Sequence, residues 1–83
     1  MSESNTDDLL REIGRRVASI RRERGWTQDR LATELAVSVK YVQRIEGGRE
    51  NLTVRSLVKL ADALGGQLQL DIETNVTAGS VQP

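Results

Sequence analysis

The chain has 83 residues, with 12 basic and 12 acidic side chains and neither histidine nor cysteine. This length gives one small domain whose limited core favours oligomerisation. Without cysteine the chain can form no disulfide, and without cysteine or histidine it lacks the usual zinc ligands. Histidine is also the commonest general base, so we expect no catalytic residue, no metal site and no cofactor. The apolar runs are too short to cross a membrane, and the acidic start MSESNTDD is unlike a signal peptide.

The zero net charge is an average of two unlike regions. All 12 basic residues lie between Arg11 and Lys59, where there are only six acidic residues, so this window has a net charge of +6. The flanks carry the other six acidic residues and no basic one. A basic centre of this kind is a usable footprint for phosphate groups.

The first helix is expected to begin at Thr6, which can cap it. Residues 1–5 are expected to be disordered. An apolar stripe at helical spacing follows, and glycine at Gly25 suits the end of the helix. The stripe consists of Leu10, Ile13, Val17 and Ile20, with Gly14 allowing close packing. Trp26 is expected to be a core or staple residue at the junction, and the alternative is a platform on which a base stacks.

Two short helices joined by a tight turn are predicted between Thr27 and Glu46. Thr27 and Ser38 are good N-caps, so the bend falls at Ala36 and Val37. Residues that point inward are expected to be Leu31, Ala32, Leu35, Val42 and Ile45. The second helix then exposes Lys40, Tyr41, Gln43 and Arg44, side chains that suit the major groove of DNA.

A loop and a fourth helix follow Glu46. Residues 47–51 have the composition of a loop and lack the lysine pattern of a phosphate-binding loop. Thr53 can cap the next helix, which Gly65 and Gly66 end. Its core face is expected to be Val54, Leu57, Leu60, Ala61 and Leu64.

Residues 67–73 alternate polar and apolar side chains with the period of a strand. Because no second strand is predicted, the simplest partner is the same strand of another copy across a two-fold axis. Leu68, Leu70 and Ile72 would then form the dimerisation contacts. The alternatives are a tail that lies on its own subunit or a short fifth helix. Residues 74–83 are polar and small, and are expected to be a disordered tail.

The run from Gly25 to Gly65 resembles the phage repressor and Cro (Xre-type) helix-turn-helix family. Its ordered features are Thr-Gln before Leu-Ala, a capped helix that ends in Ile-Glu, a Gly-basic loop and a Leu-x-x-Leu-Ala-x-x-Leu-Gly helix. The resemblance covers about residues 11–65, and it departs from the family at Leu52, where many members have proline. It implies a mainly α fold with a four-helix repressor-like domain over residues 6–66. The alternation of residues 67–73 adds to this a short C-terminal β-strand that pairs between subunits.

Site residues follow from the family pattern, position by position. In the family, an arginine at the position of Arg21 pairs with the glutamate that closes the recognition helix, here Glu46; the alternative is a solvated arginine. The recognition helix is Ser38–Glu46. Candidates for DNA base contacts are Val39, Lys40, Gln43 and Arg44. Candidates for DNA backbone contacts are Gln28, Tyr41, Arg49 and Asn51.

The resemblance implies a homodimeric, sequence-specific regulator of transcription that binds double-stranded DNA, often as a repressor of its own promoter. Such a protein is expected in the cytoplasm, associated with the nucleoid. A helical head followed by a strand also resembles the repressor-antitoxins of the Hip toxin–antitoxin type. The alternative function is therefore an interaction module that holds a protein partner such as a toxin. An enzyme is disfavoured, because the sequence has no paired-carboxylate or glycine-rich phosphate motif.

Overall fold

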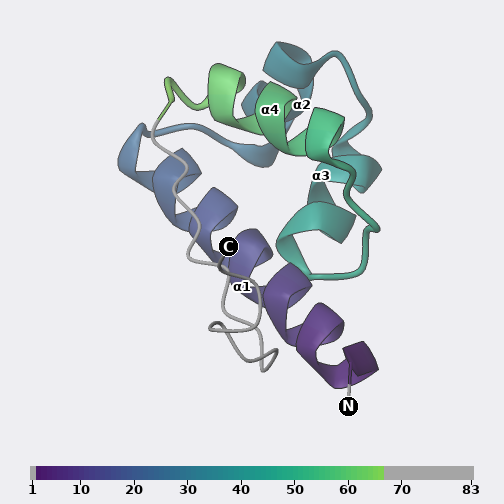
Figure 1. Cartoon of the computed structure of the whole chain (residues 1–83). Coiled ribbons are helices and arrows are strands. Elements are labelled where there is room, and N and C mark those ends of the chain that lie inside the picture. The colour runs from purple at the N-terminus through teal and green to yellow at the C-terminus, as the bar shows by residue number, and fades with distance from the viewer. Residues whose placement is uncertain (1, 67–83) are drawn as a thin grey trace.

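A computed structural model of the protein describes residues 2–66, with side chains from Thr6 onward. These residues form four helices and no strand, which confirms the mainly helical class (Figure 1). The expected strand over 67–73, with Leu68, Leu70 and Ile72, and the expected tail over 74–83 lie outside the described residues. The helices are α1 (Ser2–Glu23), α2 (Gln28–Leu35), α3 (Val39–Glu46) and α4 (Val54–Ala63).

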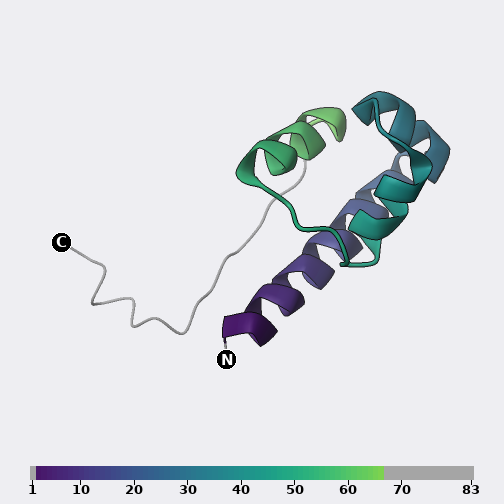
Figure 2. The ribbon, with the colours of Figure 1, turned by 90° about the vertical axis from the view of Figure 1, so that its right-hand side faces the viewer.

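Helix α1 begins earlier than the sequence predicts. Its first residue is Ser2, so the N-cap expected at Thr6 is wrong and residues 2–5 are helical. Extending an existing helix by a turn is far easier than starting one. Figure 2 shows this end of α1 projecting beyond the other three helices.

The three shorter helices begin at the residues that the sequence identifies as N-caps. The hydroxyl oxygens of Thr27, Ser38 and Thr53 each accept a hydrogen bond from the backbone N–H three residues further on, at 3.0, 3.1 and 3.0 Å. Each cap contributes about 1 kcal/mol to the stability of its helix. Each cap residue has an extended backbone and immediately precedes the first helical residue. The three caps therefore set where α2, α3 and α4 begin.

The turn between α2 and α3 is as tight as the sequence predicts. Ala36 ends α2 in the left-handed region at φ 59°, and its N–H donates to the carbonyl oxygens of Ala32 and Thr33. The Val37 N–H donates to the Ala32 carbonyl oxygen at 3.0 Å. An L-residue in this region costs roughly 1–2 kcal/mol, so the surrounding packing must hold the turn in place.

The core lies where α1 and α2 meet α3 and where α2 meets α4. The sequence identified its central members correctly, but Val54 is wrong because it is 77% exposed. A periodic stripe shows which face of a helix is apolar but does not show how far the neighbouring helices reach over it. The fully enclosed cluster consists of Ile13, Val17, Leu31, Ala32, Val42, Ile45, Leu60 and Leu64.

The crossing of α1 and α3 is close because α1 has a glycine there. A Cβ atom on Gly14 would lie 2.7 Å from the carbonyl oxygen of Glu46, and closer still to that of Ile45. No side chain at this position avoids the backbone of α3, so glycine sets how near the two helices can come.

We expect Gly14→Ala to destabilise the fold by about 1–3 kcal/mol, since the overlap outweighs the roughly 1 kcal/mol by which alanine favours a helix. Thermal unfolding followed by circular dichroism measures this change. Ser19→Ala, at an exposed position of the same helix, should leave the melting temperature nearly unchanged. Equal melting temperatures for the two variants would contradict the close crossing.

Candidate nucleic-acid interface

Helix α3 has one face in the core and one in solvent. Val42 and Ile45 are fully buried, and this fixes the rotation of the helix about its axis. Lys40, Gln43 and Arg44 are consequently exposed together on the other side. An eight-residue helix that presents two cations and an amide in one direction has the donors that guanine and adenine edges accept in the major groove.

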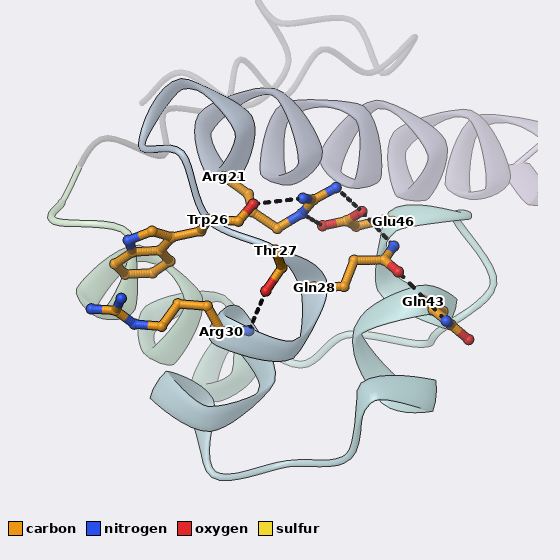
Figure 3. Close-up of polar contacts among 7 residues, drawn as sticks. All are labelled: Arg21, Trp26, Thr27, Gln28, Arg30, Gln43 and Glu46. Carbon is orange, nitrogen blue, oxygen red and sulfur yellow. Dashed lines mark hydrogen bonds and ion pairs between the residues drawn. The ribbon is translucent and has the colours of Figure 1, made fainter.

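A buried ion pair attaches α3 to α1. Arg21 is only 8% exposed, and its Nε and Nη2 atoms donate to the two carboxylate oxygens of Glu46 at 2.6 and 3.1 Å. Its Nη1 donates to the carbonyl oxygen of Trp26 at 2.9 Å (Figure 3). All three guanidinium nitrogens therefore have partners, as a buried cation requires. The structure thus contains the pair that the family resemblance implies.

Gln28 extends this network to the exposed face of α3. Its Nε2 donates to Glu46 Oε1 at 3.0 Å, and its Oε1 accepts a long hydrogen bond of 3.5 Å from Gln43 Nε2 (Figure 3). Because a carboxylate only accepts hydrogen bonds, Glu46 determines which end of the Gln28 amide faces it. The family pattern predicts Gln28 only as a phosphate contact. In the structure Gln28 also contacts Gln43, a candidate for base contact.

A hollow open to solvent lies beside α3, bordered by Lys40, Gln43, Arg44 and Arg49. Within residues 6–66, Lys40 and Arg49 contact no carboxylate, whereas Arg44 Nε donates to Glu50 Oε1 at 2.9 Å. Lys40 and Arg49 therefore keep their positive charge available to a ligand at this hollow.

Three arginines of α1 pair with acidic residues of the same helix. Arg11 pairs with Asp8, and Arg15 and Arg16 both pair with Glu12. Hydrogen bonds from Arg15 and Arg16 hold the pKa of Glu12 below its ordinary value. These pairs partly neutralise the positive charge of α1.

The remaining candidates divide by burial. Val39 and Tyr41 are half-buried and pack against the core, so each offers only part of its surface to a ligand. Asn51 is exposed in the loop after α3. Sequence reasoning missed Glu50, because a loop residue has no periodicity that would indicate the direction of its side chain.

Trp26 has the role of a junction residue. Its ring is half-buried against the core, with the guanidinium carbons of Arg24 and Arg30 at 4.8 and 4.7 Å from the ring centroid. Two cation–π contacts of this kind stabilise the ring where it lies, between α1 and α2. A ring with these neighbours has little free face for a base to stack upon.

The capped helix α2, the tight turn at Ala36 and the partly exposed helix α3 define a helix-turn-helix. The helix-turn-helix family model matches residues 17–70, and the chain belongs to this family, in its Xre (Cro/C1) type. Over 58 residues the chain is 40% identical to a protein of Sinorhizobium fredii (strain NBRC 101917 / NGR234) named as an uncharacterized HTH-type transcriptional regulator, y4dJ. That alignment covers 70% of this chain and 75% of the relative.

No solved structure matches the chain significantly. Between residues 2 and 66, no helix is both long and apolar enough to span a membrane. The family makes the chain a DNA-binding regulator of transcription.

We expect Glu46→Ala to destabilise the fold by about 3–5 kcal/mol, because the charge of Arg21 would remain buried without its partner. The matched control is Glu34→Ala, which breaks an exposed pair with Arg30 and should cost no more than about 1 kcal/mol. Chemical denaturation of both variants measures the free energies of unfolding. Similar losses of unfolding free energy in the two variants would mean that the buried pair matters no more to stability than the exposed one.

Proposed function

We propose that this protein is a dimeric repressor that occupies an inverted repeat in its own promoter. Helix α3 with its cap, Ser38–Glu46, enters the major groove of each half-site. The observation that carries this proposal is the exposed face of α3, where Lys40, Gln43 and Arg44 lie together opposite the buried Val42 and Ile45.

Base readout is assigned to side chains on α3. Lys40 and Arg44 suit guanine, which offers two acceptors in the major groove, and Gln43 suits adenine, which offers one acceptor and one donor. Val39 is half-buried at the start of α3, where its exposed part suits contact with a thymine methyl group.

Phosphate contacts are assigned to residues around α3. Arg49 and Asn51 are exposed in the following loop, and Tyr41 lies on α3 itself. One Nε2 hydrogen of Gln28 is used by Glu46, and the second remains for a phosphate at the N-terminus of α2. These contacts set the position of the protein on the duplex but not its sequence preference.

A dimer gives each of two half-sites one helix-turn-helix. Half-sites about one helical turn apart, roughly 34–36 Å, fit two copies related by a two-fold axis. The strand predicted over 67–73 supplies the subunit contact through Leu68, Leu70 and Ile72, and the small core supports association. Repression then requires only that the bound dimer blocks the promoter.

The proposal is tested by fluorescence anisotropy with DNA from upstream of the gene and with a random duplex, each over a salt series. We expect binding to the upstream duplex at salt concentrations where binding to the random duplex is lost, because phosphate contacts weaken with salt faster than base contacts. Equal and equally salt-sensitive binding to both would refute autoregulation.

A pair of lysine variants separates base readout from general charge. Lys40→Ala should lower the preference for the upstream duplex by about 1–3 kcal/mol, since it removes one base contact. Lys59→Ala removes the same charge from an exposed position on α4 and should leave the preference unchanged. Equal effects of the two would show that Lys40 contributes charge alone.

The subunit contact is tested by removing residues 67–83. Because the enclosed core lies within residues 13–64, the shortened chain should keep its helical circular dichroism. Analytical ultracentrifugation should show monomers, and affinity for the upstream duplex should fall by at least tenfold, because each half-site would then be bound separately. A shortened chain that still sediments as a dimer would place the interface elsewhere, for example on α4 at the exposed Val54 and Val58.

A further inference from the structure

An acidic side chain lies within the surface assigned to DNA. Glu50 accepts a hydrogen bond from Arg44 Nε at 2.9 Å, and its side chain is 21% exposed compared with 56% for Arg44. The neighbouring exposed cations are Lys40 and Arg49. A carboxylate at this place opposes phosphate binding by simple charge repulsion. Such a group needs an explanation other than general attraction to DNA.

The loop that carries Glu50 is held at both ends. The backbone N–H groups of Gly48 and Arg49 donate to carbonyl oxygens in the last turn of α3 at 3.0 and 2.8 Å. Gly48 lies against α1, where an added Cβ would be 2.7 Å from Arg11 Cγ, and Leu52 packs on the core. Glu50 therefore has a well-supported backbone and can hold the long Arg44 side chain in one place.

The contact uses only one part of the Arg44 guanidinium. Glu50 accepts from Nε, so the edge formed by Nη1 and Nη2 keeps its hydrogens for other acceptors. That edge can donate to the O6 and N7 atoms of one guanine. A guanidinium held at Nε loses less side-chain freedom when it binds a base than an unrestrained one.

We propose that Glu50 is a positioning residue that directs Arg44 toward a guanine and lowers the affinity of the protein for DNA of other sequences. This inference rests on the proposed function and adds a determinant of specificity to it. On a matched site, the Arg44–guanine contact offsets the repulsion between Glu50 and the phosphates. On any other site, the repulsion remains and Arg44 has no base partner.

Two variants separate the effect of the Glu50 charge from the effect of its hydrogen bond to Arg44. Glu50→Gln keeps an oxygen that can accept from Arg44 but removes the negative charge, and Glu50→Ala removes both. We expect both variants to bind a random duplex at least about threefold more tightly at low salt, with a steeper salt dependence. The guanine preference should weaken strongly in Glu50→Ala and much less in Glu50→Gln.

The base preferences are measured by selecting binding sites from a random duplex library with the full-length protein and each variant. Glu34→Gln is the matched control, since it removes a carboxylate paired with Arg30 on another helix and should select the wild-type motif. In an Arg44→Ala background, adding Glu50→Ala should not change the selected motif further, because Glu50 acts on base preference through Arg44. Circular dichroism melting confirms that each variant is folded.

Three outcomes overturn the inference. An unchanged motif for Glu50→Ala would show that the hydrogen bond from Arg44 to Glu50 does not direct Arg44. A further change of motif in the Arg44→Ala background would show that Glu50 affects base preference by another route. In both cases the proposed function stands. Failure of the wild-type protein to select any motif would overturn the proposed function and this inference together.

Discussion

The ion pair between Arg21 and Glu46 is the interaction on which the position of α3 and its exposed face depends. It joins the end of α1 to the end of α3, and both side chains are almost fully removed from solvent. Burying such a pair adds little net stability, because both charges lose their hydration. Its effect is on geometry, since a carboxylate with bidentate contacts and a guanidinium with three bound nitrogens permit few alternative arrangements.

The helix-turn-helix combines a rigid support with adaptable side chains. Glycine at Gly14 brings α1 close to the backbone of α3, and Val42 and Ile45 fix the rotation of that helix. Polar contacts then reach outward in steps, from Glu46 to Gln28 and on to Gln43. A surface built in this way holds its backbone still while the ends of its long side chains can adjust to a ligand.

Much of this fold can be predicted from the sequence because its signals are local. The caps at Thr27, Ser38 and Thr53, the stripe through Ile13 and Val17 and the turn at Ala36 each depend on a few neighbouring residues. The errors arise where the outcome depends on non-local packing or on the extension of a helix. Val54 is exposed although it continues an apolar stripe, and α1 starts before its expected cap. At the site, residue type indicated Lys40, Gln43 and Arg44, but no sequence pattern indicated that Glu50 contacts Arg44 or that Gln28 contacts Gln43.

The placement of the aromatic residues has an optical consequence. The chain has one tryptophan and one tyrosine: Trp26 lies at the junction of α1 and α2, and Tyr41 lies on α3. Excitation energy absorbed by tyrosine passes to a nearby tryptophan with an efficiency that depends on their separation. The molecule therefore carries a natural donor on α3 and a natural acceptor just before α2. Its own fluorescence can follow the position of α3 relative to α1 without any added label.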